Sequence, residues 1–275
     1  MSASIQMLPS VSATAATRID ETARVSENAE IGAGCTVMPY AVIGDRVRLG
    51  PGCTVYPHAV LEGPAQIGPK NEFHPFACIG GPPQDLRHRG EPTELVIGEG
   101  NVFREMVTVN RGTVHGGGKT VIGDANLFMA YTHIAHDCRV GNRVVFANHA
   151  TLAGHTAVED YAVFGGMVAV GTFLRVGESA MLAAGAMIER DVVPFCIVAG
   201  DRARLRAVNR VGLARRGFDD RARRQIKMIF RALKDPSQTV SEIIASFQTF
   251  KDDFPSPEAE RMLAFVTKAK RGLVR

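Results

Sequence analysis

The sequence contains no tryptophan, and aromatic residues make up only 7% of its 275 residues. Its five cysteines are odd in number and form no C-x-x-C pair, which argues against a disulfide framework and a zinc knuckle. The longest weakly polar run, residues 161–174, is too short to span a bilayer and contains glycines. The N-terminal stretch MSASIQMLPSVSATAAT has neither the basic nor the apolar region of a secretory signal. We therefore expect a cytoplasmic protein without stable membrane insertion.

What the chain does have is a composition of 45% hydrophobic and 22% charged residues, which is typical of a folded domain, and 28 glycines, which indicate many tight turns. The net charge of +4 is unevenly distributed. Residues 201–275 hold 18 Lys and Arg against 9 Asp and Glu, whereas residues 1–200 carry a net charge of −5. This asymmetry predicts either an anionic partner for the C-terminal part or a solvated helical surface there.

The strongest pattern is a repeat of six residues. Bulky apolar residues recur at every sixth position in three runs, which gives 26 matches in 26 steps. The runs are Ile19, Val25, Ile31, Val37, Ile43, Leu49, Val55, Leu61, Ile67, Phe73 and Ile79; Ile97, Phe103 and Val109; and Ile122, Phe128, Ile134, Val140, Phe146, Leu152, Val158, Phe164, Val170, Val176, Leu182 and Ile188.

A period of six fits neither an amphipathic helix nor an alternating strand. It is typical of a parallel β-helix of hexapeptide repeats, in which three hexads make one triangular coil and the apolar position points inward. A glycine often follows the apolar residue, and the fifth position is usually small. Cys35, Cys53 and Cys138 occupy that fifth position, so we interpret them as packing residues.

After Pro194 the pattern becomes helical. The segment 200–234 has apolar residues near helical spacing, with Asp219 and Asp220 placed to start a helix, and residues 235–237 form a turn. Residues 239–252 and 256–271 predict two more helices, the second with Pro257 in its first turn. We therefore predict a flexible N-terminal segment over residues 1–18, a β-helix with two loop insertions over 19–199 and an α-helical cap over 200–275.

Because the repeat fills the core, chemistry must come from outward positions and from the two interruptions of the repeat. Histidines cluster at His133, His136, His149 and His155. The separation of His136 and His155, close to three hexads, places these two nearly one coil apart on one face. Asp137 could orient a ring nitrogen of His136. Three interpretations stay open from these residues alone: a metal site, a general base, or surface histidines at turns.

Several strings carry a more specific resemblance, namely HIAHDC, ATLAGH, RGTVHGGGKT, GGPPQDLRHRGEPT, FGGM and ARRGF. They resemble the UDP-N-acetylglucosamine O-acyltransferases, the family that performs the first step of lipid A synthesis. The resemblance runs from about residue 19 to the C-terminal end and includes both interruptions. It implies a left-handed β-helix, a homotrimer with sites between neighbouring subunits, and an acyl carrier protein as the donor partner.

The resemblance also implies residue roles. His136 would take the proton from the 3-hydroxyl of a UDP-amino sugar, Asp137 would polarise it, and the backbone N–H of Gly154 would bind the oxyanion. The positions that it implies for substrate binding are Asp85, Arg87, His133, His155, Gly171, Thr172, Asn209, Arg215 and Arg216. It implies no metal, no cofactor and no nucleic-acid partner.

Three positions depart from the family pattern. Gly171-Thr172 stands where the family usually has His-Gln, Asn110 where it has His, and Arg87 where it has Lys. These departures leave open a 3-amino sugar acceptor and a non-catalytic paralogue that only binds sugar nucleotides. Ala184, near the position where the family measures the acyl chain, is small and would leave room for a longer chain.

Two further enzyme classes compete with this interpretation. A related hexapeptide N-acyltransferase would have an extra domain before the β-helix, for which the short N-terminal segment leaves no room. A β-helical zinc hydratase would need three imidazoles around one metal, whereas HIAHDC favours a base held by a carboxylate.

Overall fold

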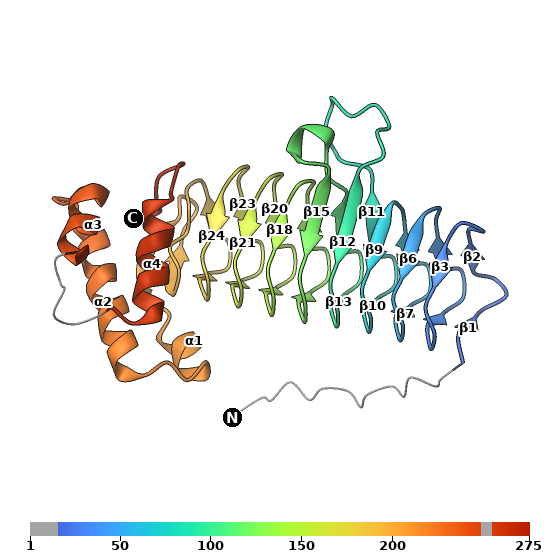
Figure 1. Cartoon of the computed structure of the whole chain (residues 1–275), viewed down its shortest axis with the longest axis horizontal. Helices are drawn as coiled ribbons and strands as arrows, with labels where there is room; N and C mark the ends of the chain where they lie inside the picture. The colour runs from blue at the N-terminus through green and yellow to red at the C-terminus, as the bar shows by residue number, and fades with distance from the viewer. Residues whose placement is uncertain (1–15, 249–254) are drawn as a thin grey trace.

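The protein is a long triangular β-helix followed by a helical cap at its C-terminal end (Figure 1). The computed structural model describes residues 16–248 and 255–275, so most of the predicted N-terminal segment lies outside it. Parallel strands form three sheets, and the predicted left-handed hexapeptide β-helix is confirmed. None of the helices in the described residues has the length and apolarity needed to span a bilayer.

Each sheet takes one strand from each coil. Sheet A contains β1 (Arg18–Ile19), β4 (Thr36–Val37), β7 (Thr54–Val55), β10 (Glu72–Phe73), β13 (Val102–Phe103), β16 (Leu127–Phe128), β19 (Val145–Phe146), β22 (Val163–Phe164), β25 (Met181–Leu182), β27 (Cys196–Ala199) and β28 (Arg204–Val208). Sheet B contains β2 (Arg24–Val25), β5 (Val42–Ile43), β8 (Val60–Leu61), β11 (Cys78–Gly81), β14 (Thr108–Asn110), β17 (His133–Ile134), β20 (Thr151–Leu152), β23 (Ala169–Val170) and β26 (Met187–Ile188). Sheet C contains β3 (Glu30–Ile31), β6 (Val47–Leu49), β9 (Ala65–Ile67), β12 (Glu94–Ile97), β15 (Lys119–Ile122), β18 (Arg139–Val140), β21 (Ala157–Val158) and β24 (Arg175–Val176).

The strand register explains the repeat. Thr36 pairs with Thr54 and Val37 with Val55, so one coil takes three hexads. From Val37 onward every residue of the apolar series is buried, whereas Ile19 at the open end of the prism is 49% exposed. The fourth residue of most hexads turns the corner with a positive φ, for example 59° at Tyr40. A positive φ turns the chain sharply within one or two residues, so three short strands can form one triangular coil.

The interior is built from rows of like side chains stacked along the prism. Along sheet A, five phenylalanine rings form a row with centroids 4.1–5.3 Å apart, in the order Phe73, Phe103, Phe128, Phe146 and Phe164. Cys35, Cys53 and Cys138 are buried at the fifth position, as predicted. Three other fifth positions hold asparagines that hydrogen-bond from coil to coil, because a buried polar group needs a partner: Asn71, Asn101 and Asn126.

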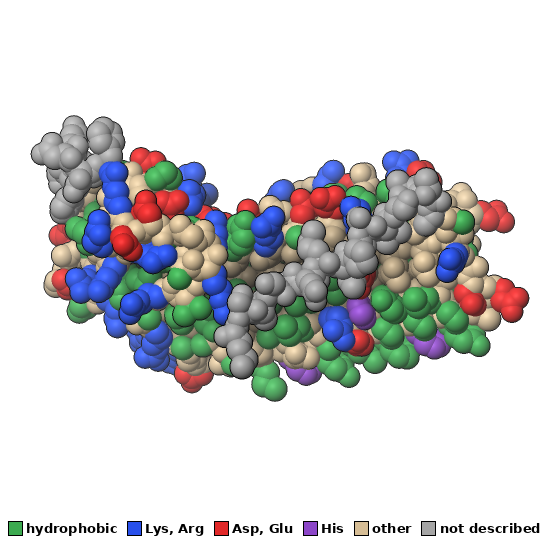
Figure 2. All heavy atoms as spheres, turned by 90° about the horizontal axis from the view of Figure 1, so that it is seen from below, with side chains coloured by type: hydrophobic (Ala, Val, Ile, Leu, Met, Phe, Trp, Pro, Cys, Tyr) green, Lys and Arg blue, Asp and Glu red, His purple; other side chains and the backbone are tan. Residues whose placement is uncertain are grey.

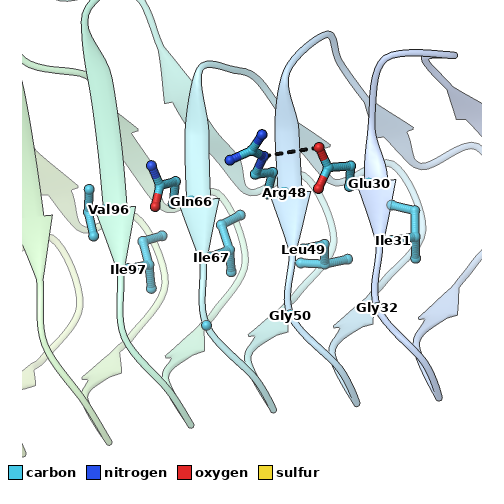
Figure 3. Close-up of a pocket in the computed structure, with 11 residues that line it drawn as sticks. Glu30, Ile31, Gly32, Arg48, Leu49, Gly50, Gln66, Ile67, Val96 and Ile97 are labelled. Carbon is cyan, nitrogen blue, oxygen red and sulfur yellow. Dashed lines mark hydrogen bonds and ion pairs between the residues drawn. The ribbon is translucent and has the colours of Figure 1, made fainter.

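The outer face of sheet C carries polar side chains in the first coils (Figure 3). Arg48 Nε donates to Glu30 Oε1 at 3.1 Å across neighbouring coils, and Gln66 lies next in the row. A glycine follows most strands of sheet C and lies at the corner, where a Cβ on Gly50 would come within 2.5–2.7 Å of the next coil's backbone. Close coil stacking therefore requires glycine at that position.

Both interruptions of the repeat leave the prism at the same corner, between sheets B and C. The first insertion joins β11 to β12 and the second joins β14 to β15, where it forms the short 3-10 helix η1 (Val114–Gly116). Figure 1 shows both loops projecting from one side of the β-helix. Because they belong to successive coils, they cover one stretch of that edge.

The cap contains α1 (Arg210–Arg215), α2 (Asp220–Lys234), α3 (Val240–Gln248) and α4 (Pro257–Thr267). Asp219 caps α2 by accepting from the Ala222 N–H at 2.7 Å, and Pro257 lies in the first turn of α4. The predicted helical character of residues 200–209 is wrong for residues 204–208. They form β28, which pairs antiparallel with β27 and buries Leu205, because the last sheet edge is paired more favourably than left open. The domain boundary at residues 199/200 stays a prediction, as does the N-terminal segment, and residues 249–252 of the third predicted helix lie outside the described residues.

Candidate active site

The corner between sheets B and C brings three turn residues into one row. His136 follows β17, Gly154 follows β20 and Thr172 follows β23, and these strands pair in register through Ile134, Leu152 and Val170. Each step along the row is therefore one coil, or about 4.8 Å. The next residue of each turn forms a parallel row of Asp137, His155 and Phe173.

The Asp137 carboxylate is the buried centre of this corner, with only 1% of its side chain exposed. Its Oδ2 accepts hydrogen bonds from His136 Nδ1 at 2.8 Å and from Thr113 Oγ1 at 2.7 Å. Its Oδ1 accepts from the Thr113 N–H at 2.9 Å. These bonds compensate the cost of burying the carboxylate and hold its plane in one orientation.

This contact sets the tautomer of His136. A carboxylate oxygen accepts, so Nδ1 carries the proton and Nε2 of the neutral ring keeps its lone pair. The His136 side chain is 13% exposed, so it is held by the protein and still open to a ligand. A neutral imidazole in this state can take a proton at Nε2.

Gly154 packs against the same ring. A Cβ at residue 154 would lie 2.6 Å from Cε1 and 2.9 Å from Nε2 of His136. Among the described residues, the N–H of Gly154 has no hydrogen-bond acceptor. The corner thus combines an imidazole lone pair with a close, unpaired backbone N–H.

Two further histidines surround this pair. His155 stands at a T-shaped angle to His136 with ring centroids 5.2 Å apart, and its Nε2 lies 3.7 Å from Asp137 Oδ2. His133 Nδ1 lies 2.7 Å from Thr108 Oγ1. Burial lowers the pKa of both His133 and His155, which favours the neutral form of each ring.

The first insertion places Asp85 and Arg87 beside this cluster. Arg87 holds the Asp85 carboxylate through Nε at 3.1 Å and Nη2 at 2.8 Å. The Arg87 guanidinium is the main cause of the lowered pKa of Asp85, and a smaller contribution comes from His136. The arginine fork found here in place of lysine is therefore a two-point contact within the loop.

His136, Asp137 and His155 have the spacing that a metal ion could bridge, since one ligand atom from each lies within 4.8 Å of the others. However, His136 Nδ1 already donates to Asp137 Oδ2, and Thr113 Oγ1 donates to the same carboxylate oxygen. The contacts are those of a carboxylate that orients an imidazole.

The positions that depart from the family pattern also lie on sheet B or at its corner with sheet C. The Gly171 N–H donates to the Ile188 carbonyl, and Thr156 Oγ1 donates to the Gly171 carbonyl at 3.0 Å. Gly171 thus contributes backbone only, one residue before Thr172 in the row above Gly154. Asn110 is buried; its Nδ2 donates to the Pro82 carbonyl at 2.9 Å, and its Oδ1 lacks a partner within the described chain.

The predicted cap residues lie at a different corner, between sheets C and A. Arg216 ion-pairs with Glu178, donates to Ser179 Oγ at 2.8 Å and stacks on the Tyr161 ring at 3.9 Å. Asn209 caps α1 and donates to the Ser179 carbonyl at 2.9 Å, so its amide is already used. Arg215 is exposed at the end of α1. One chain therefore does not bring the cap residues to His136.

Sequence reasoning missed the residues that support Asp137. Thr113 and Gly116 belong to the string RGTVHGGGKT, whose only visible signal was its resemblance to a family motif. The contact of Thr113 with Asp137, which lies well beyond it along the chain, depends on how the second insertion folds back.

Comparisons with known proteins identify the family to which this fold belongs. Residues 22–57 and 119–154 match the model for bacterial transferase hexapeptide repeats. Residues 191–274 match the model for domain 2 of UDP N-acetylglucosamine O-acyltransferase.

The chain is 48% identical over 259 residues to the acyl-[acyl-carrier-protein]–UDP-N-acetylglucosamine O-acyltransferase of Alkalilimnicola ehrlichii, covering 94% of this chain and 100% of that protein. It is 44% identical to the Thermodesulfovibrio yellowstonii protein of the same name, covering 94% and 99%. The solved structure of the Francisella novicida UDP-N-acetylglucosamine acyltransferase superposes with a TM-score of 0.89 at 32% identity, covering 94% of each chain.

Proposed function

Because this chain belongs to the family of UDP-N-acetylglucosamine O-acyltransferases, we propose that it transfers a 3-hydroxyacyl group from acyl carrier protein to the 3-hydroxyl of UDP-N-acetylglucosamine. We place this reaction in the cytoplasm, as an early step of lipid A synthesis. The observation that carries the proposed mechanism is the His136–Asp137 pair with Gly154 against the imidazole.

In the proposed reaction, His136 Nε2 takes the proton of the sugar 3-hydroxyl as its oxygen attacks the thioester carbonyl. A C–O bond forms, and the tetrahedral intermediate then collapses with cleavage of the C–S bond. The proton held on His136 passes to the departing thiolate, which leaves as the carrier protein's thiol. Asp137 keeps the imidazole oriented and stabilises its protonated form. No covalent acyl-enzyme is needed.

The N–H of Gly154 is the proposed donor to the oxyanion. A preorganised donor of this kind contributes roughly 3–4 kcal/mol to stabilising such a transition state. The absence of a competing acceptor for this N–H within the described residues supports the assignment.

The sugar site is proposed to lie between the first insertion and the histidines. Asp85 would accept hydrogen bonds from glucosamine hydroxyls, and Arg87 would hold that carboxylate in place. The neutral His133 and His155 would line the cleft without adding charge next to the base. Gly171 and Thr172 would contact the acceptor or the acyl chain from the coils above.

The nucleotide phosphates are assigned to Arg215 and Arg216, with Asn209 beside them. Arg215→Ala is expected to weaken UDP-sugar binding by about tenfold or more, the equivalent of one charged hydrogen bond. Because Arg216 also supports the cap through Glu178 and Tyr161, Arg216→Ala should lower the melting temperature as well. Isothermal titration with UDP-N-acetylglucosamine would measure the affinity.

Arg210→Ala is the matched control, since it removes an exposed arginine from the same helix, α1. It should leave both affinity and melting temperature close to those of the unmodified protein. If the double variant Arg215→Ala/Arg216→Ala bound UDP-N-acetylglucosamine with unchanged affinity, the phosphate site would not lie on the cap.

We infer a homotrimer whose neighbouring subunits complete each site, since His136 and Arg216 lie on different corners of one chain. A row of exposed side chains along the third corner supports self-association. We call it the A–B ridge, and its members are Tyr40, His58, Phe76, Met106, Tyr131, His149 and Met167. Figure 2 shows hydrophobic and histidine side chains following one edge of the β-helix. An apolar row of this length is typical of a surface that another protein covers.

Met167→Asp should therefore shift the protein from trimer towards monomer, because it places a charge in the covered ridge. Asp tolerates the positive φ of 59° at this position, so the strand turn itself should survive. Sedimentation velocity would measure the shift. Met228→Asp, which charges an exposed methionine on α2, is the control; an equal shift in both variants would contradict the ridge assignment.

The cap is the proposed docking surface for the acidic carrier protein. Residues 201–275 carry a net charge of +9, and Lys and Arg side chains gather on the cap in Figure 2. Electrostatic attraction of this kind mainly raises the association rate.

A 3-amino sugar acceptor is the second candidate, and it rests on Gly171-Thr172 and Asn110. Transfer assays with 3-hydroxyacyl carrier proteins of graded acyl length, offered UDP-N-acetylglucosamine or its 3-amino analogue, would decide. Turnover of the hydroxyl acceptor supports the O-acyltransferase, and turnover of the amine alone assigns the departures to acceptor choice. Transfer to neither acceptor would favour a binding-only paralogue.

A further inference from the structure

We propose that Thr113, in the second insertion, is a positioning residue for the acyl transfer, because it fixes the Asp137 carboxylate and through it the His136 ring. This inference rests on the proposed function and adds a residue to which none of the family motifs assigns a role. It makes the second insertion part of the catalytic apparatus rather than a loop that only covers the corner.

Thr113 holds both carboxylate oxygens at once. Its N–H donates to Oδ1 at 2.9 Å, and its Oγ1 donates to Oδ2 at 2.7 Å. Two donors from one residue prevent the carboxylate from rotating about its Cβ–Cγ bond. Since His136 Nδ1 bonds to Oδ2 at 2.8 Å, any rotation of Asp137 would move or release the imidazole.

The hydroxyl of Thr113 is itself oriented by the fold. Thr113 caps η1, and its Oγ1 accepts from the Gly116 N–H at 3.0 Å. The proton of that hydroxyl is therefore free to point at Asp137, away from the capping bond. A serine could make the same pair of hydroxyl bonds, whereas a valine of similar volume could make neither.

Two other contacts close the remaining sides of Asp137. A Cβ on Gly116 would lie 2.0–2.3 Å from the carboxylate atoms, so η1 packs against them without a gap. The Asp137 N–H donates to Thr120 Oγ1 at 2.8 Å, which holds the backbone from β15. The second insertion and the strand that follows it thus surround one carboxylate.

The charged and titratable groups near Asp137 do not replace Thr113. They are His136, His155, Asp85 and Arg87, with His133 beside His136. Of these, His136 donates to Oδ2 and His155 Nε2 lies 3.7 Å from it. Within the described residues, the donor to Oδ1 is the Thr113 N–H alone.

The test compares Thr113→Val with Thr113→Ser in the full-length protein. Thr113→Val should lower kcat by about 10- to 100-fold, the loss typical at metal sites when an outer hydrogen bond that orients a ligand side chain is removed, with a much smaller change in KM. Thr113→Ser should restore most of the activity. Thr93→Val is the matched control, because it removes a buried hydroxyl that lacks a partner in the described chain.

A second readout does not depend on turnover. The His136 Nδ1 proton bonded to Asp137 should give a downfield proton NMR signal, which should be weakened or lost in Thr113→Val and kept in Thr113→Ser. Gly116→Ala, which pushes on the carboxylate from η1, should also disturb this signal and provides a second variant if Thr113→Val folds poorly.

The outcomes separate the two proposals. An unchanged signal with normal kcat in both Thr113→Val and Gly116→Ala would overturn the positioning role. Equal losses in Thr113→Val and Thr93→Val would also overturn it, since they would indicate a general packing defect. If the unmodified protein transferred no acyl group while the NMR signal still depended on Thr113, the result would contradict the proposed reaction. It would still support the role of Thr113 in positioning His136.

Discussion

Replacing His136 with alanine is expected to lower kcat by about 10²–10⁴-fold, the usual contribution of a general base. The imidazole is the group with a free nitrogen lone pair beside Gly154, and Asp137 fixes which nitrogen that is. Alanine leaves the backbone and the β-helix core in place, so the protein should fold. Single-turnover acyl transfer with saturating substrates would measure the effect on the chemical step.

His74→Ala is the matched control for this variant. The His74 side chain is 17% exposed, close to the value for His136, and it also contacts carboxylates, Glu72 and Glu105. It lies on sheet A, away from the candidate active site. His74→Ala should keep near-normal turnover; if His136→Ala did the same with its fold intact, another group must act as the base.

Gly154→Ala is expected to cost about 10²-fold in kcat, the loss that a misplacement of about 1 Å can cause at a reacting group. The added methyl would lie 2.6 Å from Cε1 of His136, so the ring must move away from its present place. The backbone at residue 154 has no positive φ, so the variant should not strain the turn itself. A crystal structure of the variant should show the imidazole displaced from Asp137.

Gly166→Ala provides the comparison at a similar turn. A Cβ there would meet only the Asn148 carbonyl oxygen, at an ordinary 3.4 Å. This variant should retain both its activity and its melting temperature. Normal turnover in Gly154→Ala would show that the close contact between this backbone and the imidazole is not needed.

Much of this protein could be predicted from the chain alone. The six-residue spacing of apolar residues predicts the coil length, the buried rows and the β-helix, because a period of six has few other physical solutions. The helix starts at Asp219 and Ser256 follow from local capping chemistry, which depends on neighbouring residues only. The spacing of His136 and His155 also places the two rings on one edge.

Other features needed the folded chain. Residues 204–208 look helical by spacing and form a strand, because the open edge of the last coil offers them a partner. Asn209 and Arg216 resemble ligand-binding residues in the sequence, yet their polar groups also hold the cap to the β-helix. Such roles depend on how the cap packs against the β-helix, and the neighbouring residues in the sequence do not predict that packing.

The repeat of apolar residues was enough to predict the triangular prism and the edge on which His136 and His155 lie, since strand period and turn chemistry are local properties. The way in which the two insertions fold back over that edge is visible only in the folded chain, where Thr113 and Gly116 enclose Asp137 and Arg87 holds Asp85 beside it. These contacts join residues separated by loops without a regular pattern, and their geometry is set by close packing rather than by period.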